Sequence, residues 1–121
     1  MMGTMRTTVV IVDDHEQFRA SARAMLESEG YAVVGEAQNA EEALDAVMRL
    51  RPDILLLDIQ LPDLDGFEVA QRIAAGADRP ATVLMSSRSA ATYAVQLAST
   101  PACGFIAKVD LSGTALAALV P

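Results

Sequence analysis

The sequence predicts an α/β protein with one parallel β-sheet and helices on both of its faces. Five short runs of β-branched or apolar residues alternate with segments in which apolar residues recur at helical spacing. The connections are only a few residues long, which favours strand–helix–strand units within one domain. The third run, Ile54–Leu57, is wholly apolar and ends at Asp58. Such a run is typical of a strand that is buried on both faces, as in a parallel sheet.

Local signals along the chain define the individual elements. Gly30 is a favourable stop for the first helix, Asn39 followed by Glu42 resembles a capping box at the start of the second, and Pro52 ends that helix. Threonine, tyrosine and valine between residues 90 and 98 lower the propensity of the fourth helix. The predicted strands are residues 8–12, 31–36, 54–58, 82–85 and 104–107. The predicted helices are residues 15–29, 39–51, 66–75, 90–98 and 111–120.

The composition limits the classes of function. The formal net charge of −7 argues against a nucleic-acid-binding surface on this segment, because phosphate binding needs clustered Lys and Arg. No apolar stretch is long enough to span a membrane, and residues 1–8 lack the apolar core of a secretory signal. The lone Cys103 indicates a reducing compartment. We therefore expect a cytoplasmic protein with one domain over residues 6–121, an extension at residues 1–5 and a truncated last helix.

Polar residues at the ends of the predicted strands form a candidate site. Asp13 and Asp14 follow the first strand, Asp58 ends the third, Ser86 follows the fourth and Lys108 follows the fifth. Because the carboxyl ends of parallel strands lie at one edge of the sheet, these side chains should converge if their strands are neighbours. Closely spaced carboxylates repel one another unless a cation joins them, and Mg²⁺ prefers such oxygen ligands. With a hydroxyl and an ammonium group, they form a candidate site for a phosphoryl group, with Asp58 as its acceptor.

Simpler interpretations of the same residues stay open. The acidic pair could cap the first helix, Asp58 could belong to a turn, and Ser86 could cap the fourth helix. A single lysine such as Lys108 is usually solvated surface. His15 is expected to be a residue of the first helical turn and not a ligand. The coincidence of all four strand-end features favours a phosphoryl site over a set of independent caps.

These features together resemble the receiver domain of two-component response regulators. The resemblance extends over residues 6–118. Its motifs are, in chain order, Asp13-Asp14, Asp58 followed by Leu61-Pro62 and Asp65-Gly66, Ser86-Ser87, and Gly104–Lys108. It implies the flavodoxin-like, doubly wound (βα)5 fold, with a five-stranded parallel sheet in the order 2-1-3-4-5.

The resemblance also implies a role for each residue at the site. Asp58 would accept a phosphoryl group from the phosphohistidine of a sensor histidine kinase or from a small phosphodonor. Asp14, Asp58 and the backbone carbonyl of Gln60 would bind Mg²⁺ directly, and Asp13 would act mainly through water. Lys108 would pair with the phosphoryl oxygens. Catalysis would consist of positioning and charge neutralisation, without enzymatic action on other substrates.

Further residues would respond to the phosphoryl group or control access to it. Ser86 would turn inward to hydrogen-bond the group, and Phe105 is the aromatic switch position that rotates with it. Gln60 and Arg88 line the approach and would tune dephosphorylation by controlling water access. Val109 stands where the family usually has Pro, so the loop after the fifth strand is expected to depart from the family.

The segment from Phe105 to Gly113 is most similar to receivers with a LuxR-type helix-turn-helix output domain. We therefore expect part of a transcription regulator that forms a homodimer on phosphorylation; a stand-alone receiver is the alternative. A Mg²⁺-dependent phosphatase with an aspartyl nucleophile is a further alternative, but such enzymes often have a second acid where this chain has Gln60. A receiver that only docks or dimerises would not need the acidic set and Lys108.

Overall fold

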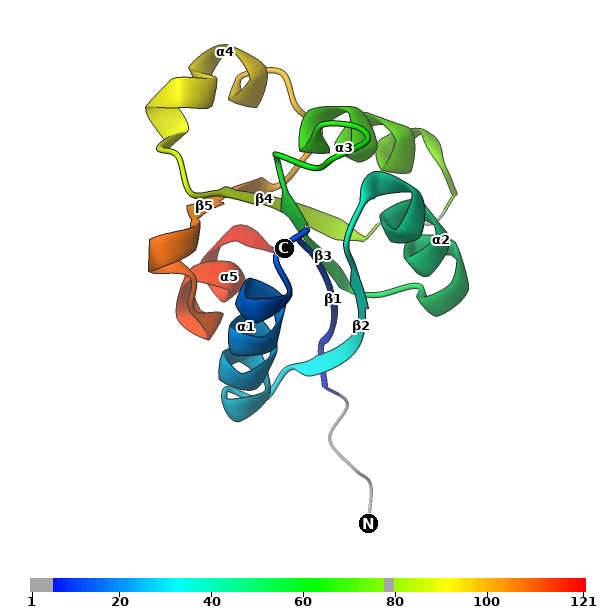
Figure 1. The fold of residues 1–121 in the computed structure, drawn as a ribbon, viewed down its shortest axis with the longest axis vertical. Coiled ribbons are helices and arrows are strands. Elements are labelled where there is room, and N and C mark those ends of the chain that lie inside the picture. Colours follow the sequence, from blue (N-terminus) through cyan, green and yellow to red (C-terminus); the bar gives the residue numbers. More distant parts are fainter. Residues whose placement is uncertain (1–5, 78–79) are drawn as a thin grey trace.

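The computed structural model has a five-stranded parallel sheet between two layers of helices (Figure 1). It describes residues 6–77 and 80–121, so the extension expected at residues 1–5 lies outside the described residues. The strands are β1 (Thr8–Val12), β2 (Ala32–Ala37), β3 (Ile54–Asp58), β4 (Ala81–Ser86) and β5 (Gly104–Ala107). Their order in the sheet is β2-β1-β3-β4-β5, which confirms the predicted fold class.

Helices and short 3-10 turns connect the strands over the described ranges. They are α1 (Glu16–Ser28), α2 (Ala40–Leu50), α3 (Gly66–Ala75), the turn η1 (Ala90–Tyr93), α4 (Ala94–Leu97), the turn η2 (Lys108–Asp110) and α5 (Gly113–Leu119). Within residues 6–77 and 80–121, every helix is too short or too polar to cross a membrane.

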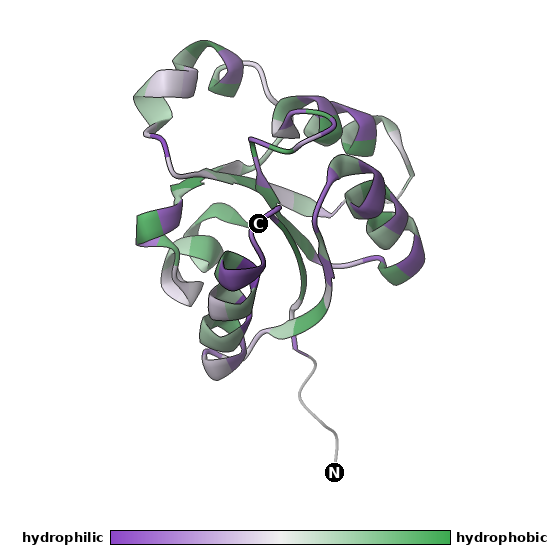
Figure 2. Cartoon of the chain, viewed as in Figure 1, coloured by the Kyte–Doolittle hydropathy of each residue, from purple (hydrophilic) through white to green (hydrophobic). Residues whose placement is uncertain are grey.

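Each face of the sheet has its own hydrophobic core, because alternate residues of a strand point to opposite faces. Val10 and Val12 of β1 belong to the core under α2 and α3, whereas Val9 and Ile11 belong to the core under α1 and α5. Every residue of β3 is buried, which explains its apolar sequence. Figure 2 shows hydrophobic residues along the central strands and mixed faces on the surrounding helices.

The segment predicted as one helix at residues 90–98 is instead the turn η1 followed by the four-residue helix α4, so this prediction was wrong. Tyr93 lies at the junction with φ −114° and ψ 20°, a conformation outside the α-helical region. Its side chain is buried, whereas α4 has no buried residue. The buried ring holds the backbone at the junction, and the weak helix propensity of the neighbouring residues does not oppose the break.

The last helix begins at Gly113 and not at Leu111, so its predicted start was two residues early. Ser112 is the N-cap, and its hydroxyl accepts a hydrogen bond from the backbone N–H of Ala115 at 3.0 Å. Residues Lys108–Asp110 form the turn η2, in which Val109 is 90 % exposed. The strands β2 and β4 agree with their predicted bounds to within one residue at each end.

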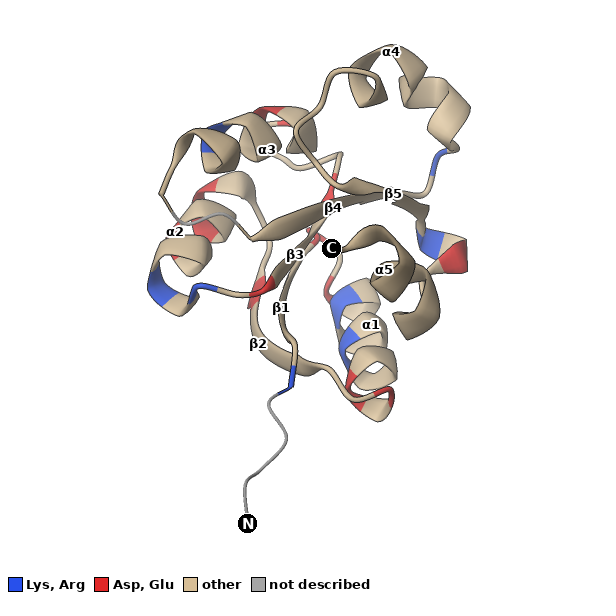
Figure 3. Cartoon of the chain, turned by 180° about the vertical axis from the view of Figure 1, so that it is seen from behind, with Lys and Arg blue, Asp and Glu red and all other residues tan. Residues whose placement is uncertain are grey.

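The charged residues are distributed unevenly over the fold. Residues 89–107, which include η1, α4 and β5, contain no charged side chain, and neither do residues 111–121. Figure 3 shows α4, β5 and α5 without charge, next to the charged helices α1, α2 and α3. The acidic excess of the chain therefore lies on the α1–α3 side.

Asp63, in the loop after β3, caps a helix that lies earlier in the chain. Its carboxylate accepts hydrogen bonds from the backbone N–H groups of Ala40 at 2.8 Å and Glu41 at 3.1 Å, at the start of α2. Asn39 accepts a third, from Glu42 N–H at 2.8 Å. The bond from Ala40 is the main reason that the pKa of Asp63 lies below its usual value.

Replacing Asp63 with alanine should lower the midpoint of thermal unfolding by a few degrees, because two N–H groups of α2 lose their acceptor. A depressed pKa stabilises the fold above the unfolded-state value, and this stabilisation is lost as the pH falls through the folded value. The difference between Asp63→Ala and wild type should therefore disappear in acid. Asp45→Ala, which removes only an exposed ion pair with Arg49, is the matched control and should unfold near the wild-type midpoint. An equal loss in both variants would contradict the capping role.

Candidate functional site

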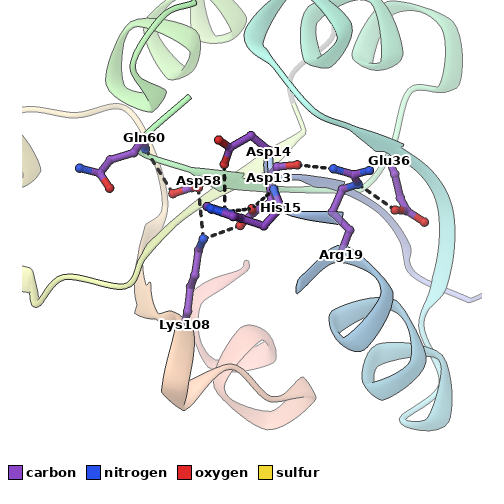
Figure 4. A network of polar contacts seen from close by, with 8 residues as sticks. All are labelled: Asp13, Asp14, His15, Arg19, Glu36, Asp58, Gln60 and Lys108. Atoms are coloured by element: carbon purple, nitrogen blue, oxygen red, sulfur yellow. Dashed lines mark hydrogen bonds and ion pairs between the residues drawn. The ribbon is translucent and has the colours of Figure 1, made fainter. Parts of the chain in front are cut away.

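Of the polar residues predicted at the strand ends, Asp13, Asp14, Asp58 and Lys108 converge at one edge of the sheet (Figure 4). The strand register places Asp58 beside Met85 and Ser86 beside Ala107, so β3, β4 and β5 end close together. Asp58 is 3 % exposed and Asp13 is fully buried. These two carboxylates lie among apolar strands, where an isolated charge is strongly disfavoured.

Lys108 joins the two buried carboxylates. Its Nζ lies 2.5 Å from Oδ2 of Asp13 and 3.2 Å from Oδ2 of Asp58, at which it also donates a hydrogen bond. The ammonium group also lies 4.7 Å from the centroid of the Phe18 ring, within the range of a cation–π contact. Lys108 is thus a positioned charge at the site and not solvated surface.

Burial and the charge of the ion-pair partner act in opposite directions on the pKa of Asp58 and on that of Lys108. Burial raises the pKa of Asp58, the charge of Asp13 adds to this, and the ammonium group of Lys108 opposes it. Burial acts to lower the pKa of Lys108, but its close contact with the Asp13 carboxylate and the charge of Asp58 outweigh burial and raise it. Lys108 therefore stays charged at neutral pH, while two acids compete for it.

The acidic loop after β1 is held from two sides. The N–H of His15 donates to Oδ1 of Asp13 at 2.8 Å, and Nη1 of Arg19 donates to the backbone carbonyl of Asp13 at 2.7 Å. Arg19 is in turn paired with Glu36 of β2, with Nε and Oε1 3.0 Å apart. Asp13 therefore has a fixed orientation, supported by both α1 and β2.

The ligand atoms of the acidic cluster fit a hard divalent cation. Oxygen atoms of Asp13, Asp14 and Asp58 and a ring nitrogen of His15 lie within 4.8 Å of one another. Carboxylate oxygens are the ligands that Mg²⁺ prefers, and a cation between them would remove their mutual repulsion. His15 precedes α1 as its N-cap residue, and its Nδ1 lies 3.0 Å from Oδ1 of Asp14 and 3.1 Å from Oδ1 of Asp13. His15 therefore contacts both carboxylates of the acidic pair, which was not expected of a residue of the first helical turn.

Gln60 and Arg88 follow the ends of β3 and β4 and line one hollow. The backbone N–H of Gln60 donates to Oδ1 of Asp58 at 3.2 Å, and both side chains are exposed. They line a hollow of about 390 Å³ between α3 and the η1–α4 segment, together with Phe67 and Tyr93. Their predicted role in controlling water access to Asp58, and so dephosphorylation, stays a prediction.

Sequence reasoning missed the contact that holds Ser86. Its hydroxyl is buried, accepts a hydrogen bond from the backbone N–H of Arg88 at 3.0 Å, and lies 3.3 Å from the hydroxyl of Tyr93. The ring of Tyr93 lies between those of Phe67 and Phe105, at centroid distances of 5.8 and 6.4 Å. From the sequence, Tyr93 is only a residue of low helix propensity, so nothing in the pattern indicated this contact.

Gly66 allows the loop after β3 to close against the end of that strand. A Cβ atom at this position would lie 2.7 Å from the backbone oxygen of Asp58 and 2.8 Å from Cα of Ile59. The N–H of Gly66 donates to the carbonyl of Ile59 at 2.7 Å and so closes the loop. Asp65-Gly66 is one of the motifs of the receiver resemblance, and this close approach gives the glycine a steric reason.

The order of the strands and the buried acids joined by a lysine define the class of protein: a flavodoxin-like domain with a charged site at the carboxyl edge of its sheet. A family model of the response regulator receiver domain matches residues 9–118. The chain belongs to this family.

Relatives and solved structures agree with this family. The chain is 36% identical over 111 residues to a protein from Pseudomonas aeruginosa named as a transcriptional regulator, covering 91% of this chain and 54% of that protein. It is 31% identical over 104 residues to the virulence-factor transcription regulator BvgA of Bordetella pertussis, covering 86% of this chain and 50% of BvgA. The signal receiver domain of the response regulator NarL from Mycobacterium tuberculosis superposes with a TM-score of 0.84 at 29% identity, covering 96% and 98% of the two chains.

The chain therefore spans about half the length of these two transcription regulators. It is also 41% identical over 81 residues to a protein from Hahella chejuensis named as a protein-glutamate methylesterase/protein-glutamine glutaminase, covering 67% of this chain but 23% of that protein. Receivers of this sequence type thus occur in proteins with different activities.

Proposed function

We propose that this receiver domain accepts a phosphoryl group on Asp58 from the phosphohistidine of a sensor histidine kinase, in a reaction that needs Mg²⁺. The observation that carries this proposal is the pairing of the buried Asp58 carboxylate with the Lys108 ammonium group, beside a second buried acid, Asp13. Burial first, and then the charge of Asp13, raise the pKa of Asp58, and perturbed carboxylates of this kind are concentrated at functional sites.

In this proposal each residue of the site has its own part. An oxygen of Asp58 forms the new bond to phosphorus while the bond from phosphorus to the kinase histidine nitrogen breaks and the imidazole takes up a proton. Lys108 neutralises charge on the phosphoryl oxygens, and the backbone N–H of Gln60 orients the Asp58 carboxylate. Mg²⁺ held by Asp13, Asp14, Asp58 and the carbonyl of Gln60 would supply the remaining charge neutralisation.

The same group would switch the output surface. A phosphoryl group adds roughly −1.5 to −2 charge and three acceptor oxygens. Ser86 turns toward it and Phe105 follows, which changes the surface formed by α4, β5 and α5. This surface has no charged side chain from residue 89 to residue 107, and Val95 is 83 % exposed. Such a surface suits association with a second copy of the chain or with an output domain.

The function of the whole protein is proposed from its relatives. Residues 6–121 would form the receiver domain of a cytoplasmic transcription regulator, in which an output domain and not this acidic segment binds DNA. A stand-alone receiver is the alternative. An in-frame helix-turn-helix segment after Pro121 in the gene would establish the first, and a stop codon there the second.

Incubation with acetyl phosphate tests the proposal without knowledge of the kinase. We expect one phosphoryl group per chain by intact-protein mass spectrometry when Mg²⁺ is present, and none in excess EDTA. The adduct should be labile to hydroxylamine, as an acyl phosphate is. Absence of an adduct in a folded, Mg²⁺-saturated sample would overturn the proposal. Sustained turnover of a small phosphomonoester would instead favour the aspartyl-nucleophile phosphatase.

A further inference from the structure

Ser86 is directed away from the phosphoryl acceptor by its partners. Within the described part of the chain, its hydroxyl contacts the backbone N–H of Arg88 and the hydroxyl of Tyr93, and it makes no hydrogen bond to Asp58 or Lys108. A serine hydroxyl has one proton and two lone pairs, so these two contacts occupy most of its capacity. Either hydroxyl of the Ser86–Tyr93 pair can be the donor. In the arrangement in which Ser86 donates to Tyr93, Ser86 must give up this partner before its proton can serve a phosphoryl oxygen.

Tyr93 is the partner that can be given up. The bond from Arg88 N–H lies within the turn that follows β4, at 3.0 Å. The distance of 3.3 Å between the Ser86 and Tyr93 hydroxyls is long for an O–H···O bond, whose usual distance is about 2.7–2.8 Å. A weak bond between neutral groups can be exchanged at small cost for a charge-assisted bond to a phosphoryl oxygen.

The ring of Tyr93 anchors the segment after β4. It is the buried side chain of η1, while Val95 of α4 is 83 % exposed and α4 has no buried residue. Its ring contacts Phe67 of α3 on one side and Phe105 of β5 on the other. The Tyr93 ring thus links the end of η1, where α4 begins, to Phe67 and Phe105.

We propose that Tyr93 is a positioning residue that restrains Ser86 in the unphosphorylated domain and releases it when Asp58 is phosphorylated. Release leaves a buried phenol without its partner, which is unfavourable. The hollow of about 390 Å³ that borders Tyr93, Gln60 and Arg88 gives the phenol a route to water, and α4 shifts with it. This inference rests on the proposed function, because it needs a phosphoryl group at Asp58.

The test uses Tyr93→Phe, which keeps the ring contacts and removes only the hydroxyl. Beryllium fluoride with Mg²⁺ forms a phosphoryl-like anion on a carboxylate, and its affinity can be measured by isothermal titration calorimetry. Because the restraint on Ser86 is lost, we expect Tyr93→Phe to bind beryllium fluoride about 2- to 10-fold more tightly, the range of one neutral hydrogen bond. Its affinity for Mg²⁺ alone should equal that of wild type.

Two controls separate the restraint from a general structural effect. Tyr31→Phe removes the other tyrosine hydroxyl of the chain, which donates to the carbonyl of Gly113 at 3.0 Å, and should leave the affinity unchanged. In a Ser86→Ala background, Tyr93→Phe should have no further effect, because the restrained hydroxyl is absent. Equal or weaker binding by Tyr93→Phe, or the same gain in the Ser86→Ala background, would overturn the proposal.

Tyrosine fluorescence gives a second readout. The chain has no Trp, so Tyr31→Phe leaves Tyr93 as its only tyrosine. Its emission should change when beryllium fluoride and Mg²⁺ are added, and unchanged emission with saturated ligand would count against the release. If the wild-type chain takes no phosphoryl group from acetyl phosphate, the proposed function fails and the restraint with it. If wild type is phosphorylated but Tyr93→Phe binds like wild type, the restraint alone fails.

Discussion

Replacing Asp58 with asparagine should abolish phosphorylation by acetyl phosphate and at the same time stabilise the domain at neutral pH. The amide cannot form the acyl phosphate, so labelling should fall to background. Lys108 keeps Asp13 as its partner, at 2.5 Å, so the substitution does not leave a buried lysine unpaired. Asp45→Asn, which changes an exposed acid on α2, should be labelled like wild type. Full labelling of Asp58→Asn would contradict the assignment of the acceptor.

The gain in stability follows from the sign of the pKa shift. Burial and the charge of Asp13 raise the pKa of Asp58 in the folded chain, so the folded state prefers the protonated form. Above both pKa values the ionised carboxylate therefore weakens folding, and Asp58→Asn should unfold with a free energy about 1 kcal/mol higher than wild type without metal. The difference should shrink as the pH falls through the raised pKa. Mg²⁺ should stabilise wild type more than the variant, and urea unfolding at several pH values measures all three effects.

Replacing Gly66 with alanine should destabilise the domain by about 1–3 kcal/mol and weaken the site. The added Cβ would lie 2.7 Å from the backbone oxygen of Asp58 and 2.8 Å from Cα of Ile59. Both are backbone atoms, so the loop or the end of β3 must shift. Because that shift moves Asp58 and the carbonyl of Gln60, we expect weaker Mg²⁺ binding and slower labelling in the fraction that stays folded.

Gly76→Ala is the matched control for the glycine substitution. Its Cβ would meet the carbonyl oxygen of Ile73 at 3.4 Å, an ordinary contact, and its φ of −87° is open to any residue. The free energy of unfolding should stay within about 0.5 kcal/mol of wild type. A similar loss in both variants would show that the close approach at Gly66 is not the cause.

The site could be predicted from the sequence wherever topology forced residues together. Asp13, Asp58 and Lys108 all lie at the carboxyl ends of strands, and in a parallel sheet those ends share one edge. Because these residues are two acids and a lysine, their shared position is enough to predict a charged site. The apolar run of β3 predicted its complete burial for the same reason.

Contacts that depend on side-chain packing between distant segments could not be predicted. Tyr93 reaches Ser86 while its ring packs between Phe67 and Phe105, and an aromatic residue in a weak helix gives no sign of these contacts. Asp63 caps a helix that begins 23 residues earlier, whereas its sequence context shows only turn chemistry. The break between η1 and α4 has the same origin, since the burial of Tyr93 decides it.

The most direct test of the phosphoryl-acceptor claim is the position of the acyl phosphate. Sodium borohydride reduces an aspartyl phosphate to homoserine, which tandem mass spectrometry of the digested protein locates. After incubation with acetyl phosphate and Mg²⁺ we expect homoserine at position 58 of the wild-type chain, and none when EDTA replaces Mg²⁺. Homoserine at Asp13 or Asp14 instead, or equal conversion of Asp58 without a divalent cation, would contradict the proposed function.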